Sequence, residues 1–266
     1  MEIFEIGEEE FFMSDTVIAA QLYTVREFTK TSEDIAKTMK KVREIGYKAV
    51  QLSALGPIDV NELKKILDAE GLTACASHVS LEEARNQTDK VIEEHKILGC
   101  KYVAIAALPS DYRSAEGYNR FAKEAAEIGK KFAAAGLVLG YHNHSFELEK
   151  FDGKTGLDII YGESDPQYLT GEIDTYWIQH GGAEPAAWIR KLKGRMPLVH
   201  FKDMGIVNGQ QAMFEVGEGN LNWPSILDAC KETGVLWYIV EQDICRRDPF
   251  ESLTISLRNM QAMGLK

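Results

Sequence analysis

One pattern recurs along this chain and restricts its fold more than any other feature: a stretch of helical periodicity, then a glycine, then a short apolar run. Five copies read MKKVREIGYKAVQL, LKKILDAEGLTACASH, EEHKILGCKYVAIA, IGKKFAAAGLVLGYHNH and LDACKETGVLWYIVEQD. Their glycines are Gly46, Gly71, Gly99, Gly136 and Gly234, and each stands where a helix would end and left-handed backbone angles are favoured. The runs that follow are short and often β-branched, which is typical of strands buried on both faces.

Three more runs, TVIAAQLY, YLTGEID and MPLVHFKD, complete a series of eight predicted strands separated by helices. The strands span roughly 16–22, 48–53, 72–78, 101–107, 137–143, 168–174, 197–202 and 236–242. Such alternation predicts an α/β fold with a parallel sheet, and eight units favour closure into a single (β/α)8 TIM barrel. An open doubly wound sheet is the alternative, and it is less favoured because no GxGxxG motif follows the first strand.

The domain organisation follows from the lack of internal breaks. No linker rich in proline, glycine or serine divides the chain, so we expect one barrel domain over residues 14–266. Residues 1–13 are acidic and weakly patterned, and we expect an N-terminal extension outside the fold. This extension lacks the basic and then apolar layout of a signal peptide.

The composition argues against several classes of function. The formal net charge of -11, without a basic stripe, argues against nucleic acid as a partner. No apolar run is long enough to span a bilayer, so we expect no membrane partner. The four cysteines, Cys75, Cys100, Cys230 and Cys245, form no CxxC pair and indicate neither a zinc ribbon nor a disulfide framework. We therefore expect ordinary thiols in a cytoplasmic protein.

Polar side chains stand at the end of one predicted strand after another. In a barrel of this type the chemistry lies at the C-terminal ends of the strands. The residues are, in chain order, Gln21, Tyr23, Gln51, His78, His142, Asn143, His144, Glu147, Asp174, His200, Lys202, Glu241 and Asp243. Ionisable groups are costly between a barrel and its helices, so this convergence predicts a polar pocket.

Four of these residues form a candidate metal-binding set: Glu147, Asp174, His200 and Glu241. Three carboxylates and one imidazole suit Mn²⁺, Mg²⁺ or Co²⁺ better than Zn²⁺. Asp174, His200 and Glu241 each end a strand of their own. Glu147 lies several residues past its strand, so its reach depends on how the loop folds back. The alternative is that some of these residues form ion pairs with Lys202 or with arginines.

Other polar residues are candidates for contacts to a substrate. They are Gln21, Gln51, His78, His144, His180 and Trp177. Because residues two apart share one side of a strand, His142 and His144 would face a substrate together. His180 would contact the substrate or cap a helix. Trp177 and Trp223 would offer an apolar face to a sugar ring or pack in the core.

In this order, the strand-end segments resemble the xylose isomerase-like barrel superfamily, in particular its sugar phosphate isomerase/epimerase branch, which includes inosose dehydratase and ketose 3-epimerases. The segments are QLYTVRE, GYHNHSFE, EID, VHFKD, VGEGNLNWPSIL and IVEQD, and they span nearly the whole chain after Met13. The resemblance implies one divalent metal, held by a glutamate, an aspartate, a histidine and a glutamate after the fifth to eighth strands. The last three match Asp174, His200 and Glu241.

The chain departs from this pattern at the fifth strand. In epimerase-like members the glutamate lies within that strand, about where this chain has Gly140. The nearest carboxylate of the right type is Glu147, which we expect to reach back to the metal. Otherwise the site has three protein ligands, and His142 or water fills the gap.

The mechanism implied by the resemblance is proton abstraction beside a carbonyl, with the metal as a Lewis acid that stabilises an enediolate. Glu147 and Glu241 are candidates for moving the proton. A metal-bound carboxylate is a weak base, so His142, His144 and Lys202 are kept as alternatives.

The leading hypothesis is therefore a metal-dependent isomerase or epimerase of a sugar, a sugar phosphate or a polyol ketone. A lyase on the same scaffold, an inosose dehydratase or an enzyme of β-elimination from 3-keto glycosides, would begin with the same proton abstraction. A non-catalytic sugar-binding barrel is a third reading. A DNA-repair endonuclease is disfavoured by only six histidines and the charge of -11. The resemblance also suggests a homo-oligomer.

Overall fold

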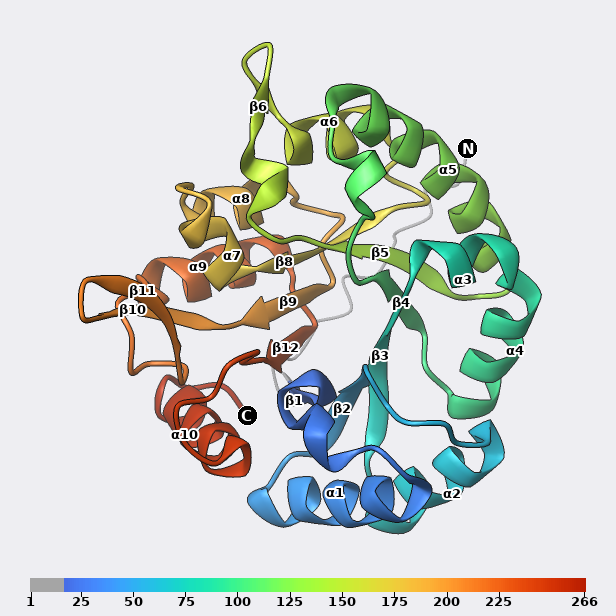
Figure 1. Cartoon of the computed structure of the whole chain (residues 1–266), viewed down its shortest axis with the longest axis vertical. Coiled ribbons are helices and arrows are strands. Elements are labelled where there is room, and N and C mark those ends of the chain that lie inside the picture. Colours follow the sequence, from blue (N-terminus) through green and yellow to red (C-terminus); the bar gives the residue numbers. More distant parts are fainter. Residues whose placement is uncertain (1–16) are drawn as a thin grey trace, which may run out of the picture.

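Eight parallel strands close into a barrel in the computed structural model, which describes residues 17–266 (Figure 1). The barrel strands are β1 (Val17–Gln21), β2 (Ala49–Leu52), β3 (Thr73–Val79), β4 (Tyr102–Ile105), β5 (Val138–His142), β8 (Thr170–Asp174), β9 (Leu198–Phe201) and β12 (Trp237–Val240). They pair in chain order, and β1 closes the ring by pairing with both β2 and β12. The predicted (β/α)8 TIM barrel is confirmed.

Helices follow the strands and surround the barrel in Figure 1. They are α1 (Ser32–Ile45), α2 (Val60–Glu70), α3 (Leu81–Asn86), α4 (Thr88–Leu98), α5 (Ala115–Ala134), α6 (Gly156–Glu163), α7 (Thr175–His180), α8 (Pro185–Lys191), α9 (Trp223–Thr233) and α10 (Pro249–Ala262). Short 3-10 turns lie at Leu22–Phe28, Ser110–Tyr112 and Phe146–Leu148. Gly71 and Gly99 end α2 and α4 with φ of 64° and 68°, the left-handed geometry expected from the repeated pattern.

Two hairpins interrupt the regular alternation, and the sequence reading did not predict them. They are formed by β6 (Lys150–Phe151) with β7 (Lys154–Thr155), and by β10 (Asp203–Val207) with β11 (Gln210–Phe214). Both turn at a dipeptide with positive φ, Asp152-Gly153 and Asn208-Gly209. Asp-Gly and Asn-Gly are strong signals for tight hairpin turns, so the information was present in the sequence.

The core has two parts. The larger part fills the layer between the barrel and its helices. The smaller part lies inside the barrel and is referred to below as the plug; its buried members are Ala19, Ala49, Cys75, Ala76, Tyr102, Leu198 and Ile239. The plug occupies the amino-terminal half of the barrel interior, which leaves the carboxyl-terminal half to the polar residues that follow on each strand.

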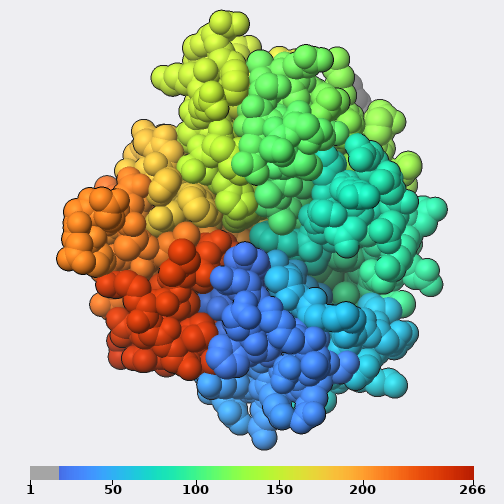
Figure 2. Space-filling view, in the orientation of Figure 1, coloured from blue at the N-terminus to red at the C-terminus, as the bar shows by residue number. Residues whose placement is uncertain are grey.

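The first and last described elements lie side by side. Figure 2 shows the blue N-terminal and red C-terminal segments in contact, and the ring of Phe28 packs edge-on against Phe250 with centroids 5.1 Å apart. The expected extension at residues 1–13 lies outside the described residues. Within residues 17–266, no helix combines the length and the apolar character that crossing a membrane requires.

Candidate functional site

The inner face of the barrel changes from apolar to polar along its strands. Residues two apart share a face of a strand. On β1 the plug residue Ala19 is followed by Gln21, and on β12 Ile239 is followed by Glu241. The same step brings Gln51, His78, His142, Asp174, His200 and Lys202 to the carboxyl-terminal half of the interior, where nearly all are buried.

Four of these side chains form a cluster, called the upper group below: His142, Asp174, His200 and Glu241. One nitrogen or oxygen from each lies within 4.8 Å of the others. The Oδ2 atom of Asp174 lies 4.0 Å from both His142 Nε2 and His200 Nδ1, and His200 Nδ1 lies 2.9 Å from Glu241 Oε2. Burial lowers the pKa of His200, but the carboxylates of Glu172 and Glu241 outweigh it and raise the value to about 10.

A carboxylate oxygen of Asp174 lies at the centre of the upper group, with the Lys202 ammonium 3.3 Å away, and makes no hydrogen bond within residues 17–266. Asp174 uses Oδ1 to accept a hydrogen bond from the backbone N–H of Trp177, which fixes the carboxylate at the start of α7. Its Oδ2 is buried without a hydrogen-bond partner in the described part of the chain. Buried polar atoms in proteins are rarely left unpaired. Two imidazoles and two carboxylates around such an atom make a suitable donor set for a divalent metal.

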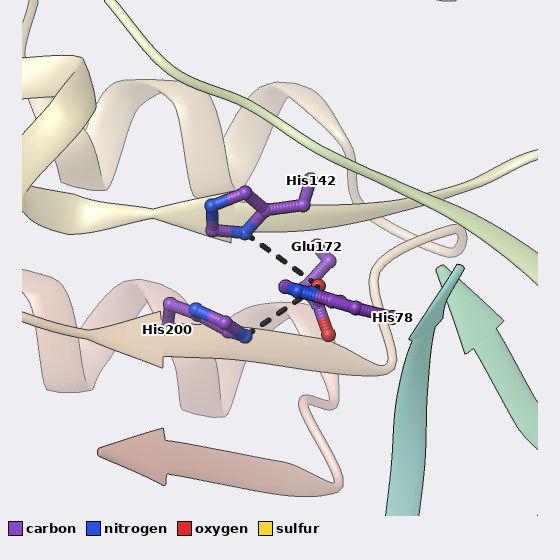
Figure 3. A group of neighbouring side chains, drawn as sticks. All are labelled: His78, His142, Glu172 and His200. Atoms are coloured by element: carbon purple, nitrogen blue, oxygen red, sulfur yellow. Dashed lines mark hydrogen bonds and ion pairs between the residues drawn. The ribbon is translucent and has the colours of Figure 1, made fainter. Parts of the chain in front are cut away.

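Directly beneath lies Glu172, a fully buried carboxylate that the sequence reading did not identify. Figure 3 shows it between the rings of His142 and His200, with His78 beside it. Its Oε1 accepts a hydrogen bond from Gln51 Nε2 at 2.6 Å, and its Oε2 lies 2.6 Å from His78 Nε2. Burial would raise the pKa of Glu172, yet the histidines His200 and His78 hold it well below its usual range.

The sequence contained a signal for Glu172. It stands two residues before Asp174 in YLTGEID, so both side chains must face the barrel interior. With His78, His142 and His200 it forms a second cluster that could hold a metal, called the lower group below. The two groups share His142 and His200.

The structure differs from the expectation for Glu147. Its Oε1 lies 2.5 Å from the Tyr141 hydroxyl, which donates to it, and its Oε2 accepts the backbone N–H of His144 at 2.9 Å. Glu147 is fully buried, and it belongs to neither metal-binding cluster found in residues 17–266. The loop folds back, as expected, but it carries the carboxylate to Tyr141 rather than to Asp174. His142, rather than Glu147, lies in the cluster with Asp174, His200 and Glu241.

At Gly140 there is room for a side chain. An added Cβ would lie 3.4 Å from Thr170 Oγ1 and 3.5 Å from Ala104 Cβ, which are ordinary contacts. The position implied by the resemblance is thus sterically open but carries no carboxylate. The carboxylate that enters the barrel in this region comes from Glu172, on the neighbouring strand β8.

Lys202 is enclosed by acidic groups. Its ammonium lies 3.3 Å from Asp174 Oδ2 and 3.1 Å from Glu241 Oε2, and it also contacts Asp243. The side chain is fully buried. Burial lowers the pKa of Lys202, but these three carboxylates outweigh it and hold the pKa above the usual range. Lys202 therefore carries a fixed positive charge beside the upper group.

Aromatic side chains form a wall next to Lys202. His144 packs against Trp177 with ring centroids 5.3 Å apart, Trp177 packs against His180 at the same separation, and Lys202 lies 5.2 Å from the centre of the Trp177 ring. Three buried polar atoms of this wall, His144 Nδ1, Trp177 Nε1 and His180 Nδ1, have no hydrogen-bond partner within residues 17–266. Of the predicted substrate contacts, these three come together here, whereas Gln21, Gln51 and His78 lie deeper, in hydrogen bonds around the lower group.

Trp223 does not reach this wall. Its indole N–H donates to Asp203 Oδ2 at 2.7 Å, and its ring packs against Phe201. Asp203 also accepts the backbone N–H groups of Met204, Gly217, Gly219 and Leu221. The VGEGNLNW segment is therefore wrapped around one carboxylate, which accounts for Trp223 as a structural residue.

A comparison with protein families decides the classification. The profile of the xylose isomerase-like TIM barrel matches residues 39–260, most of the chain. The chain belongs to this family. In this xylose isomerase-like barrel the upper group is built from the carboxyl-terminal ends of β5, β8, β9 and β12.

Solved structures resemble this xylose isomerase-like barrel over nearly its whole length. A sugar phosphate isomerase/epimerase from Parabacteroides distasonis ATCC 8503 superposes with a TM-score of 0.79 at 22% identity, covering 96% of this chain and 97% of that chain. An L-ribulose 3-epimerase gives 0.70 at 18% identity, covering 94% and 95%. The probable 3-DHS dehydratase AsbF from Bacillus anthracis gives 0.69 at 14% identity, covering 92% and 98%. At these identities the similarity establishes the fold. No curated protein matches the sequence.

Proposed function

We propose that this chain is a divalent-metal-dependent enzyme that isomerises or epimerises a sugar, a sugar phosphate or a polyol ketone. The observation that carries the proposal is the upper group: two imidazoles and two carboxylates whose donor atoms converge, with Asp174 Oδ2 free of hydrogen bonds in the described residues, beside a buried ammonium and an aromatic wall. The solved barrels named as epimerases support the same substrate class.

His142, Asp174, His200 and Glu241 would hold the metal. When bound, it supplies Lewis-acid polarisation of a substrate carbonyl. A ligand set of three carboxylates and one imidazole, as expected from the sequence, favours Mn²⁺, Mg²⁺ or Co²⁺. With His142 in place of Glu147 the set has two nitrogens, which favours Mn²⁺ or Co²⁺ over Mg²⁺ and gives Zn²⁺ a stronger case.

The remaining residues would bind the substrate and move a proton. Trp177 offers its ring and its indole N–H to a polyol, a combination suited to a sugar with one apolar face. His144 Nδ1 makes no hydrogen bond within the described residues and would accept a proton from the carbon next to the carbonyl. Lys202, whose contacts are to carboxylates, would stabilise developing negative charge, and it is unsuited to act as the base.

A lyase is the second candidate, and Lys202 is the observation that favours it. Elimination expels an oxygen that develops negative charge, and an ammonium held by Asp174, Glu241 and Asp243 would stabilise that charge. The neighbour named as a probable dehydratase agrees with this chemistry. The hypothesis of a non-catalytic sugar-binding barrel rests on the missing glutamate of the fifth strand, and it is weakened if His142 serves as the fourth ligand.

The test combines metal loading with isotope exchange. The protein is stripped of metal, reloaded with Mn²⁺, Co²⁺, Zn²⁺ or Mg²⁺, and incubated in D₂O with ketoses, inososes and 3-keto glycosides. Deuterium uptake next to the carbonyl in a product of unchanged composition supports an isomerase or epimerase, and loss of water or of an aglycone supports a lyase. Asp174→Asn should be inactive, whereas Asp165→Asn, at an exposed aspartate, should match the wild type. Full turnover without metal would refute the proposal.

A further inference from the structure

Beneath the upper group, a row of amide side chains connects the backbone after β1 with His200. The N–H of Tyr23 donates to Gln21 Oε1 at 3.2 Å, and Gln21 Nε2 donates to Gln51 Oε1 at 2.8 Å. Gln51 Nε2 donates to Glu172 Oε1 at 2.6 Å, and His200 Nε2 lies 2.6 Å from Gln51 Oε1. Gln21, Gln51, Glu172 and His200 are all fully buried, so water does not replace these contacts.

The direction of this row is fixed at both ends. A backbone N–H can only donate, so the atom of Gln21 that faces Tyr23 must be its oxygen, and its nitrogen must face Gln51. At the other end an ionised carboxylate can only accept, so Gln51 must present its nitrogen to Glu172. Both constraints leave the oxygen of Gln51 facing His200. Reversing either amide would place two donors or two acceptors against each other in a buried site, which is costly.

The consequence falls on His200. An amide oxygen accepts hydrogen bonds and donates none, so the ring nitrogen that faces Gln51 must carry a hydrogen. The other nitrogen, Nδ1, points to Glu241 Oε2 at 2.9 Å and to Asp174 Oδ2 at 4.0 Å. Nδ1 is therefore the nitrogen through which His200 can bind a cation.

Glu172 acts on His142 in the same sense. The Nδ1 of His142 lies 3.6 Å from Glu172 Oε2 (Figure 3). Its Nε2 lies 4.0 Å from Asp174 Oδ2. A carboxylate favours a hydrogen on the nearer nitrogen, which leaves Nε2 free for a cation. Outer carboxylates and carbonyls commonly orient metal-binding histidines in this way. The other lower-group side chains are engaged in hydrogen bonds, Glu172 with Gln51 and His78, and His200 with Gln51, whereas His142 Nδ1 forms none within the described residues. These bonds speak against a second metal in the lower group.

We infer that Gln21, Gln51 and Glu172 are positioning residues that hold a hydrogen on Nε2 of His200 and so direct its Nδ1 toward the metal. The inference rests on the proposed function, because the metal is what Nδ1 would bind. The sequence predicts substrate contacts for Gln21 and Gln51, whereas the inference makes them positioning residues for His200.

The test reads the ring nitrogens directly. Protein labelled with ¹⁵N-histidine is studied by long-range ¹H–¹⁵N correlation, without metal and with Zn²⁺, and His200 is assigned by its loss in His200→Gln. The wild type should show a slowly exchanging Nε2–H in both forms and zinc on Nδ1. In Gln51→Met that hydrogen should exchange at least tenfold faster, and zinc affinity should fall roughly 10–100-fold. Gln21→Met, a milder change at the first link, should act in the same direction.

Controls separate this role from general stability. Ser77 lies on β3 next to His78, and its hydroxyl forms a buried hydrogen bond with His95. Ser77→Ala removes this hydrogen bond and should leave the His200 signals and the zinc affinity unchanged. Zinc on Nε2 in the wild type, unchanged signals in both glutamine variants, or two zinc ions per chain with His78 as a ligand would overturn the inference. If the wild type bound no divalent metal but kept the protected Nε2–H, the proposed function would be refuted. The role of Gln21, Gln51 and Glu172 in holding that hydrogen on His200 would remain supported.

Discussion

The Nδ1 atom of His200 lies 2.9 Å from Oε2 of Glu241, although the two residues are 41 positions apart and come from different strands. The contact joins the ends of β9 and β12, which pair in parallel in the barrel wall. It shows that barrel closure, rather than local sequence, assembles the candidate metal centre.

Removing either partner should therefore abolish metal binding. We expect His200→Gln and Glu241→Gln each to weaken the affinity for Mn²⁺ or Zn²⁺ by at least about 100-fold, and to eliminate turnover with it. Calorimetric titration of metal-free protein measures the affinity. Glu232→Gln is the matched control, since Glu232 forms an exposed ion pair with Arg190 and should bind metal normally. Equal affinity in all three variants would contradict the assignment.

Glu147 should make stability depend on pH. Burial raises the pKa of its carboxyl to about 7 in the folded protein, from the ordinary value of 4.5. The folded state then binds more protons than the unfolded state between these values, so this group's contribution to stability is full below about pH 4.5 and is lost as the pH rises through 7. The free energy of unfolding should fall by up to about 1.4 kcal/mol per pH unit from this group.

The measurement is urea unfolding of the wild type and Glu147→Gln from pH 4.5 to 8. The amide cannot ionise, so the difference between the two proteins should grow with pH in favour of the variant. Parallel curves would show that Glu147 has an ordinary pKa in the folded protein. Glu149→Gln, on the same loop but not buried, should run parallel to the wild type.

Lys202 should contribute strongly to stability in the absence of metal. Lys202→Met would leave Asp174, Glu241 and Asp243 close together without their shared cation. Breaking a buried ion pair from one side commonly costs about 3–5 kcal/mol. Denaturant unfolding of metal-free protein measures the loss. Lys130→Met removes only an exposed pair with Glu127 and should change stability by less than about 1 kcal/mol.

Adding one methyl group at Gly219 should destabilise the loop around Asp203. A Cβ at Gly219 would lie 2.4 Å from Asp203 Oδ1, so Gly219→Ala must displace the carboxylate or the loop. We expect a loss of about 2–3 kcal/mol in the free energy of unfolding and a shift in tryptophan fluorescence, because Trp223 donates to the same carboxylate. Gly162→Ala in α6, where a Cβ meets no atom within 4 Å, should be neutral or slightly stabilising. An unchanged free energy of unfolding and unchanged fluorescence in Gly219→Ala would show that the loop can accommodate a Cβ.

The sequence was sufficient to predict the barrel because all eight strands carried an apolar run, and five of these runs followed a helix and its terminal glycine. The sequence also identified His142, Asp174, His200 and Glu241 as polar residues of one pocket, because the carboxyl ends of the strands of a parallel barrel meet. It failed for Glu147 because no periodicity governs a loop: the Tyr141 hydroxyl captures that carboxylate, and this contact depends on packing outside the barrel.

Glu172 was missed for a different reason. A carboxylate inside an apolar run looks like an interruption of the strand. The groups that make its burial acceptable come from strands distant in sequence: hydrogen bonds with Gln51 and His78, and the nearby rings of His142 and His200. Period-two counting back from Asp174 identifies the face but not the partners.

The plug limits the direction from which a substrate can reach the upper group. Its members Ala19, Ala49, Ala76 and Ile239 are fully buried, and they fill the barrel on the side away from the upper group. In the described part of the chain, a substrate would therefore reach the upper group from the carboxyl-terminal end of the barrel, and the product would leave by the same end. Product that stays at this end would compete with fresh substrate, so turnover is expected to slow as product accumulates.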